Sequence, residues 1–375
     1  MADIYGTFGD DSLVTGNGDD NIYAKSGNDT IYYGDRWGYL EGNDHIYGGL
    51  GNDTLVFYAG IESYDPVPGT SLDLQSGVAE LSLYDSSATL SLSGIENVSF
   101  NGDWGFEAWG DHKANHLSAG YGWGDFHGRG GNDLLDGGED NDTLYGDGGN
   151  DTLIGGYGDD LLVGGSGTDS IEYLDWDATD LVVDLTAGTS TGEGNDTLSG
   201  IENVTTGDGD DTVGGNAAAN VLVTAAGNDI AQGLGGNDVL TGGSGDDSLS
   251  GGSGDDSLNG GSGFDVLNGG AGIDTLTGFH HADDFVFAPG DSSIGAGFRD
   301  VVTDFSTVQG DDLDLTAFGG LTFIGQSVFS APDQVRFIHS GGNTLVQLNT
   351  VGNSGMEMEV QLNGIVNLGA GDFLL

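Results

Sequence analysis

The sequence has no cysteine, and only six of its 375 residues are lysine or arginine. Without cysteine there is no disulfide framework, thiolate nucleophile or cysteine-ligated zinc site. The six cations are scattered: Lys25, Arg36, Lys113, Arg129, Arg299 and Arg336. With no basic patch, the chain is not expected to bind a nucleic-acid backbone.

Long hydrophobic runs are also missing. No stretch approaches the roughly 18 apolar residues that a membrane-spanning helix requires, so we expect no transmembrane segment. The N-terminus, Met1-Ala2-Asp3-Ile4, has no basic region, and the first lysine is Lys25. The sequence therefore predicts no cleavable N-terminal signal peptide.

Glycine and acidic residues are abundant instead. The chain has 74 glycines, roughly three times ordinary usage, and 61 acidic residues that give a formal charge of -55. Such a composition is typical of disordered chains. However, 36% of the residues are hydrophobic, and they are regularly placed. A partner must neutralise the carboxylates before this apolar set can be buried.

The acidic residues follow a nine-residue period in three runs, with an aliphatic residue two positions after each. A linker or a solvating acidic tail would not keep leucine in register over so many copies. The aspartate position is occupied by Asp11, Asp20, Asp29, Asp44 and Asp53 in the first run, by Asp133, Asp142, Asp151, Asp160 and Asp169 in the second, and by Asp211, Asn220, Asp229, Asp238, Asp247, Asp256, Asp265 and Asp274 in the third.

The most regular copies are Gly242-Gly243-Ser244-Gly245-Asp246-Asp247-Ser248-Leu249-Ser250 and the nonapeptide 251–259. They fit the pattern G-G-x-G-x-D-x-U-x, in which U is a large aliphatic residue, of RTX calcium-binding repeats. The chain therefore resembles the RTX (repeats-in-toxin) family over about residues 4–57 and 115–287. The physical chemistry is consistent, because glycine allows positive φ and aspartate supplies the hard oxygen that Ca²⁺ prefers.

The resemblance implies an all-β fold, a right-handed parallel β-roll or β-solenoid with one coil per 18 residues. It also implies Ca²⁺ ions, on the order of ten, between equivalent turns of adjacent coils. The sixth-position aspartates would be side-chain ligands, and turn glycines such as Gly243, Gly245, Gly252 and Gly254 would supply carbonyls. Asp140 and Asp147 replace turn glycines, and Asn220 replaces a ligand, so sites there are expected to be weak or absent.

Two segments, residues 58–114 and 172–206, interrupt the repeat and resemble each other. Leu92-Ser-Gly-Ile-Glu-Asn-Val98 recurs as Leu198-Ser-Gly-Ile-Glu-Asn-Val204, and alternating apolar residues around them indicate strands. We call these segments interludes of wider β-solenoid coils. The predicted domains are a first roll (1–57), an interlude (58–114), a second roll (115–171), an interlude (172–206), a third roll (207–287) and a C-terminal capping domain (288–375).

Residues 100–127 are rich in aromatic residues and histidine. One interpretation is a carbohydrate platform or small active site, and another is a plug of large side chains where two solenoid geometries meet. A histidine-ligated transition metal is a third, although the spacing fits no familiar motif. The residues are Phe100, Trp104, Phe106, Trp109, His112, His116, Tyr121, Trp123, Phe126 and His127.

The C-terminal segment has longer predicted strands and ends in Asp372-Phe-Leu-Leu375. It resembles the C-terminal domain of serralysin-type proteins, which carries a type I secretion signal. The resemblance implies the type I secretion apparatus as a partner and a secreted, extracellular protein, either released or associated with the cell surface.

No catalytic motif precedes the repeats: the metzincin histidine pattern and a G-x-S-x-G elbow beside a helix are both absent. We therefore expect a calcium-binding protein that acts by binding and assembly, not an enzyme, with a homo-oligomer or filament and a polysaccharide as candidate partners. One alternative is the RTX part of a polysaccharide- or lipid-active enzyme. Another is a pore-forming or host-signalling protein.

Overall fold

The computed structural model describes residues 3–15, 19–33, 44–58, 71–75, 78–82, 87–101, 105–173, 179–295, 297–350 and 356–375. The insertion around Arg36 and the aromatic Trp104 lie outside these ranges. The described residues form β-strands and two short 3-10 helices, η1 (Thr316–Phe318) and η2 (Ala370–Asp372). None of the described helices is long and apolar enough to cross a membrane.

The chain divides into two compact units. The first comprises residues 1–174 with 188–201, and the second comprises residues 175–187 with 202–375. The division falls inside the predicted interlude 172–206.

In the first unit, successive strands of the rolls belong alternately to two sheets, A and B. Sheet A has the order β1 (Asp3–Tyr5), β3 (Asn21–Ser26), β5 (His45–Leu50), β9 (Ser87–Ser93), β8 (Val78–Ser82), β7 (Ser71–Asp73), β11 (Phe106–Trp109), β13 (Gly124–His127), β15 (Thr143–Gly148), β17 (Leu161–Ser166), β21 (Asn195–Ser199) and β20 (Thr189–Thr191). Sheet B has the order β2 (Ser12–Val14), β4 (Thr30–Tyr33), β6 (Thr54–Tyr58), β10 (Asn97–Asn101), β12 (His116–Ala119), β14 (Leu134–Gly138), β16 (Thr152–Gly156) and β18 (Ser170–Glu172).

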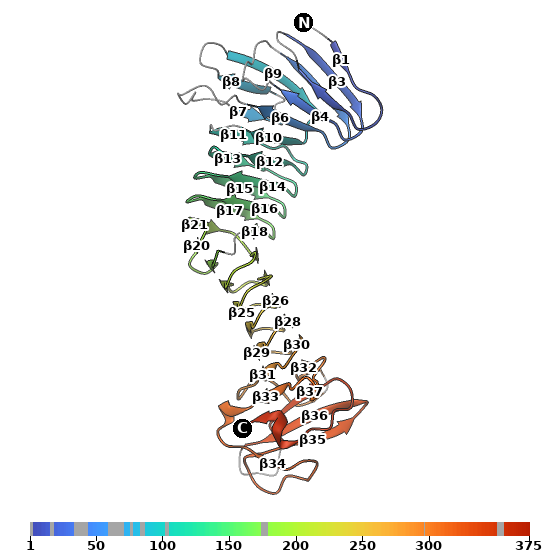
Figure 1. Ribbon diagram of the computed structural model, residues 1–375, viewed down its shortest axis with the longest axis vertical. Coiled ribbons are helices and arrows are strands. Elements are labelled where there is room, and N and C mark those ends of the chain that lie inside the picture. The colour runs from blue at the N-terminus through green and yellow to red at the C-terminus, as the bar shows by residue number, and fades with distance from the viewer. Residues whose placement is uncertain are drawn as a thin grey trace. The chain divides into compact units, whose positions relative to one another are not determined.

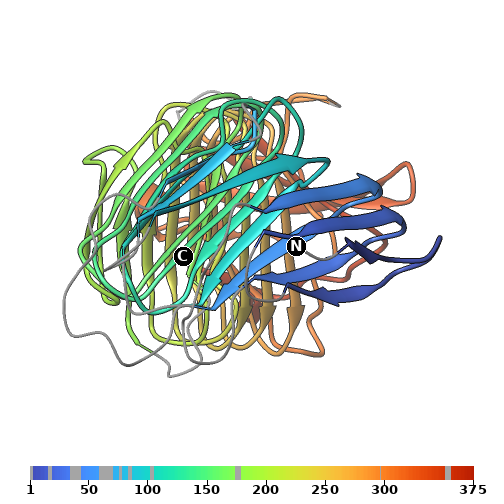
Figure 2. The same ribbon diagram turned by 90° about the horizontal axis from the view of Figure 1, so that it is seen from above.

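The pairing in both sheets is parallel in the rolls and follows the repeat. Leu144 lies beside Leu162 in sheet A, and Leu135 lies beside Leu153 in sheet B. Each pair is separated by 18 residues, which is two nonapeptides. Figures 1 and 2 show the coils of this unit stacked with their strands aligned. Antiparallel pairing occurs at β7–β8–β9 and β20–β21, inside the interludes.

The second unit repeats this arrangement and then changes it. Its sheet A has the order β19 (Val182–Asp184), β23 (Thr212–Gly214), β25 (Ile230–Gly235), β27 (Ser248–Ser253), β29 (Val266–Ala271), β31 (Asp284–Val286), β33 (Asp312–Asp314) and β38 (Phe373–Leu374). Its sheet B has the order β22 (Asn203–Thr205), β24 (Val221–Val223), β26 (Val239–Ser244), β28 (Ser257–Ser262), β30 (Thr275–His280), β32 (Val301–Val302), β37 (Met358–Leu362), β36 (Asn343–Asn349), β35 (Gln334–Ser340) and β34 (Thr322–Phe323).

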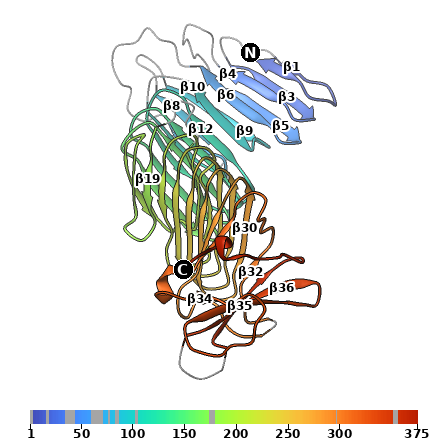
Figure 3. The ribbon, with the colours of Figure 1, turned by 60° about the horizontal axis from the view of Figure 1, so that its bottom comes forward.

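The C-terminal segment continues the two sheets. Strands β37, β36 and β35 pair antiparallel, whereas β38 at the end of the chain pairs parallel with β33. Figure 3 shows β35 and β36 at the C-terminal end of the second unit. The predicted change to longer strands holds for β35 and β36, which have seven residues each. It does not hold for β31, β32 and β33, which have two or three residues because they only continue the coils of the roll.

The core is one residue wide per strand in the regular coils. Except for the half-buried Leu13, the U residue of each repeat points inward and is buried, as at Leu135, Leu144, Leu240 and Leu258, while its neighbours along the strand face outward. This alternation is what a half-buried strand requires. The predicted all-β parallel β-roll is therefore confirmed.

Candidate metal centres

The turns before the strands of one sheet stack into a column, so each unit has two columns of turns. Within a column, the sixth-position aspartates form a ladder in which a backbone N–H donates to Oδ1 of the aspartate one coil later. Asp238 donates to Asp256, and Asp256 donates to Asp274, each at 2.8 Å. In the second roll, the backbone N–H of Asp133 donates to Oδ1 of Asp151 at 2.8 Å.

The other carboxylate oxygen, Oδ2, does not take part in this ladder of hydrogen bonds. In the described part of the chain, a set of these oxygens is buried and has no hydrogen-bond partner. An unpartnered buried carboxylate oxygen is costly and calls for a cation or a donor. The residues are Asp29, Asp44, Asp53, Asp133, Asp142, Asp151, Asp160, Asp229, Asp238, Asp247, Asp256, Asp265, Asp274 and Asp283.

Burial also changes the proton affinity of these groups. Desolvation raises the pKa of Asp142 to about 8 and the pKa of Asp133, Asp160 and Asp247 to about 7. Backbone N–H donors oppose this shift, and neighbouring carboxylates add to it. The folded turns therefore disfavour a bare negative charge unless a cation accompanies it.

Glycine leaves the space beside most of the unpartnered oxygens, whereas Ala24 and Thr224 have the equivalent place before Asp29 and Asp229. A Cβ on Gly242 or Gly251, the first residue of its turn, would collide with Oδ2 of Asp247 or Asp256. The second and fourth positions have positive φ, 117° at Gly243 and 130° at Gly245, and a Cβ there would collide with a carbonyl oxygen of the preceding coil. Backbone carbonyls and carboxylates of adjacent coils thus lie close together.

This set of donors fits Ca²⁺. All the donors are hard oxygens, which Ca²⁺ binds in sets of six to eight with flexible geometry. Among the described residues, no three histidine or acidic side chains converge on one point, so the turn carbonyls must supply part of the ligand set. The Oδ2 atoms of the aspartates and the carbonyls of the turns would hold the ion. The same finding gives no support to a histidine-ligated metal within the described part of residues 100–127.

The predicted ligand aspartates lie in these columns, but their hydrogen bonds are not all alike. Asp169 and Asp211 accept ladder bonds from Asp151 and Leu181, each at 2.8 Å. Asp11 differs, because both of its oxygens accept hydrogen bonds from Thr7.

Sequence reasoning missed five members of the columns, four outside the regular runs and one, Asp283, nine residues after the end of the third run. Each has a carboxylate oxygen that accepts a ladder bond from the preceding coil, at 3.0–3.3 Å. A signal was present, since a buried apolar residue follows each acid two positions later, as Val98 follows Glu96. The five are Glu96, Asp196, Asp283, Asp300 and Asp311.

The aromatic cluster at 100–127 separates into an inner and an outer group. Phe100, Phe106 and Phe126 are buried, and the ring of Phe106 lies 4.9 Å from that of Phe100. This part is a core plug. Outside, His127 stacks between Trp109 and Tyr145, with ring centroids 6.0 and 4.5 Å away.

The sequence matches the family of RTX calcium-binding nonapeptide repeats over residues 3–35, 40–61, 118–153, 136–171, 190–231, 224–258, 232–267 and 259–294. Among solved structures, the extracellular lipase LipA from Serratia marcescens is similar, with 14% identity and a TM-score of 0.24. The match covers 86% of this chain and 45% of the lipase, so the chain spans less than half of that protein. No curated protein matches. Because the repeat matches cover more than half of its length, the chain belongs to the RTX calcium-binding nonapeptide repeat family.

Proposed function

We propose that this protein is secreted, folds when Ca²⁺ fills its columns of turns outside the cell, and acts by binding and assembly, not by catalysis. The observation that carries the proposal is the series of buried, unpartnered Oδ2 atoms along the columns. Extracellular calcium modules bind with dissociation constants on the order of 10⁻⁴–10⁻³ M. Cytosolic Ca²⁺ would leave such sites empty, and extracellular Ca²⁺ would fill them.

The energetics favour this coupling. Equivalent turns of adjacent coils are about 4.8 Å apart, the spacing of strands in a sheet. Two carboxylates at that separation repel by about 3 kcal/mol at an effective dielectric constant of about 20. A core one residue wide per strand does not offset this repulsion in every coil. Metal binding is then part of the folding free energy.

Export through a type I secretion apparatus is consistent with an unfolded, calcium-free chain in the cytosol. The C-terminal segment supports this proposal by its resemblance to the serralysin-type domain. Its last strand, β38, completes sheet A against β33, and the backbone N–H of Leu315 donates to the Leu374 carbonyl at 2.8 Å. Folding of the third roll and ordering of the C-terminal residues would therefore occur together.

Exposed aromatic side chains support a role in binding. Tyr5, Tyr23 and Tyr47 stack along the outer face of sheet A, with ring centroids 5.1 and 4.9 Å apart. Tyr5 is 60% exposed and Tyr47 is 40% exposed. Aromatic residues that present both an apolar ring and a hydroxyl are enriched at protein interfaces.

The test combines circular dichroism with sedimentation velocity, with and without Ca²⁺ on the order of 1 mM. We expect an unfolded spectrum in chelator and a β spectrum in Ca²⁺. In Ca²⁺ we also expect a sedimentation coefficient that rises with protein concentration. Identical spectra in chelator and Ca²⁺ would contradict calcium-dependent folding, and a monomer at every concentration would contradict self-association.

A further inference from the structure

Two asparagines occupy the sixth position where an aspartate is expected. Asn115 precedes β12 and Asn220 precedes β24, so each lies in a turn of the sheet B column in its own unit. Each also lies in the first such turn after an interlude. The interludes contain the shared motif Leu-Ser-Gly-Ile-Glu-Asn-Val, at 92–98 and 198–204.

The Asn115 side chain is 3% exposed and has partners on both sides. Its Oδ1 accepts a hydrogen bond from the backbone N–H of Asp111 at 2.7 Å. Its Nδ2 donates to the backbone carbonyl of Glu96, in the motif, at 2.8 Å. Its own backbone N–H donates to Oδ1 of Asp133 at 2.7 Å, which starts the ladder of the second roll.

Asn220 makes the same set of bonds in the second unit. Its Oδ1 accepts from the N–H of Asn216 at 2.8 Å, and its Nδ2 donates to the carbonyl of Glu202 at 2.6 Å. Its backbone N–H donates to Oδ1 of Asp238 at 2.8 Å. Glu202 is the motif residue equivalent to Glu96. The arrangement therefore occurs twice, once in each unit.

The partners fix the orientation of both amides. A backbone N–H requires an acceptor and a carbonyl requires a donor, so only one orientation of the amide satisfies both contacts. An aspartate at this position could not donate to the glutamate carbonyl. Oδ1 of each asparagine takes the place that Oδ2 has in an interior turn, nearest to a Cβ on Gly110 or Gly215. There it accepts a backbone N–H and needs no cation, while Nδ2 binds the carbonyl of the preceding coil.

Two turns toward the C-terminal side of the sheet A columns are also closed by protein donors. Asp196 accepts the ladder bond from Asp160 on Oδ1, and its Oδ2 accepts from the hydroxyls of Ser190 at 2.6 Å and Tyr173 at 3.0 Å. Asp311 accepts the ladder bond from Asp283 on Oδ1, and its Oδ2 accepts from the Ser306 N–H at 2.8 Å. In contrast to the interior aspartates, both have two satisfied oxygens.

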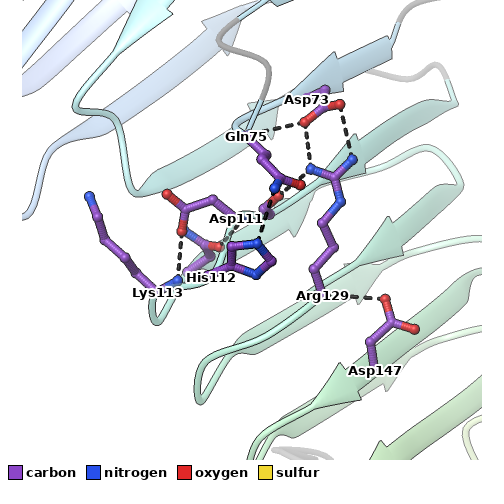
Figure 4. Close-up of polar contacts among 9 residues, drawn as sticks. Asp73, Gln75, Asp111, His112, Lys113, Arg129 and Asp147 are labelled. Atoms are coloured by element: carbon purple, nitrogen blue, oxygen red, sulfur yellow. Dashed lines mark hydrogen bonds and ion pairs between the residues drawn. The ribbon is translucent and has the colours of Figure 1, made fainter.

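Two basic side chains of the protein lie beside the Asn115 turn. Lys113 forms an ion pair with Glu96 at 2.7 Å. Arg129 binds Asp73 through two nitrogens, at 2.6 and 3.0 Å, and Figure 4 shows its guanidinium facing the Asp73 carboxylate. The backbone N–H of Lys113 also donates to Asp111 at 2.7 Å. The protein's own cations thus neutralise acids beside a turn that has no ligand aspartate.

We propose that the turns of Asn115, Asn220, Asp196 and Asp311 take no calcium, and that protein donors satisfy them instead. Asn115 and Asn220 do so with their side-chain amides, which tie the second and third rolls to the interludes. Calcium then binds only between interior turns, at the aspartates with an unpartnered Oδ2. The proposal rests on calcium binding by those interior turns.

The test counts bound Ca²⁺ by isothermal titration calorimetry and by equilibrium dialysis with ⁴⁵Ca. Asn115→Ala and Asn220→Ala are compared with Asp133→Ala and Asp238→Ala, which change the next turn of the same column. We expect the asparagine variants to bind as many ions as the unmodified protein, with a lower Tm in saturating Ca²⁺. We expect each aspartate variant to lose at least one ion.

Loss of an ion in the asparagine variants, equal to the loss in the aspartate variants, would overturn the proposal because it would make the asparagines ligands. Asn220→Asp provides a second test, since it retains the side-chain volume and adds an oxygen beside the Glu202 carbonyl. We expect it to bind one ion more than the unmodified protein. An unchanged number with tighter binding would also show that Asn220 is already a ligand. If the unmodified protein bound no Ca²⁺, the proposed function would fail before this comparison.

Discussion

At the scale of single residues, the two oxygens of each interior aspartate have different roles. Oδ1 accepts a backbone N–H of the neighbouring coil, as Asp256 does from Asp238, and this bond sets the register of the coils. Oδ2 of the same residue is buried without a partner. One side chain thus contributes to the backbone hydrogen-bond network and to a cation site, which explains why asparagine can replace it only where a donor is needed.

The first glycine of most turns lies against the unpartnered oxygen of the aspartate. A Cβ at Gly251 would collide with Oδ2 of Asp256, although Gly251 has no positive φ that would strain another residue. We predict that Gly251→Ala raises the Ca²⁺ concentration at the folding midpoint several-fold and destabilises the calcium-bound roll by about 1–3 kcal/mol, the usual cost of overpacking.

Gly371→Ala is the matched control for this substitution, because nothing lies within 4 Å of a Cβ at Gly371. Calcium titrations monitored by far-UV circular dichroism would compare the two variants. Equal midpoints for Gly251→Ala and Gly371→Ala would show that the space beside Oδ2 is not needed for the ion.

At the scale of strands and turns, the fold was largely predictable because one period fixes both the pairing and the core. The nine-residue spacing of Leu240, Leu249 and Leu258 places alternate leucines in the same sheet, and the structure pairs Leu240 with Leu258. With two nonapeptides in each coil, a parallel pairing keeps all the leucines inward only when residues 18 positions apart lie side by side. The ligand aspartates follow from the same register, two positions earlier.

The nine-residue period could not predict the structure of the segments in which the repeat is interrupted. The antiparallel strands β7–β8–β9 and β35–β36–β37 depend on tertiary pairing, and no fixed spacing announces them. Asp300 and Asp311 join the columns although 26 and 28 residues separate them from their ladder partners. The amide function of Asn115 and Asn220 required the position of the glutamate carbonyls, which spacing alone does not give.

The turns also predict how pH affects the metal-free roll. Burial raises the pKa of Asp142 to about 8 and that of Asp133 and Asp160 to about 7 in the folded state, whereas an unfolded aspartate titrates near 3.9. The folded state therefore binds more protons between these values. Its proton-linked stability is fully present below about pH 4 and is lost as the pH rises through 7 to 8.

We therefore predict that the metal-free chain has more β structure at pH 5 than at pH 8, measured by circular dichroism in metal-depleted buffer. In Ca²⁺ the direction reverses, because protons compete with the ion and its midpoint concentration rises as the pH falls. A metal-free chain that gains β structure toward pH 8 would contradict the burial of these carboxylates.

At the scale of the whole molecule, the formal charge of -55 must be neutralised locally and not merely screened. The Debye length is about 8 Å at 0.15 M ionic strength, longer than the spacing of about 4.8 Å between strands in a sheet. Monovalent salt therefore cannot screen neighbouring carboxylates in a column. Mg²⁺ has the charge of Ca²⁺, but it demands octahedral geometry and dehydrates reluctantly.

We accordingly predict that a Ca²⁺ concentration on the order of 1 mM compacts the chain. The same concentration of Mg²⁺ is not expected to do so, nor is NaCl at about 0.15 M. Small-angle X-ray scattering measures the change, since an unfolded chain of this length has a radius of gyration of about 70 Å. The repulsion is concentrated in columns of stacked, buried carboxylates, so only an ion that exchanges its water for turn carbonyls removes it. Compaction by Mg²⁺ or by NaCl at the same concentrations would mean that general charge repulsion, and not the oxygen sites of the turns, keeps the metal-free chain unfolded.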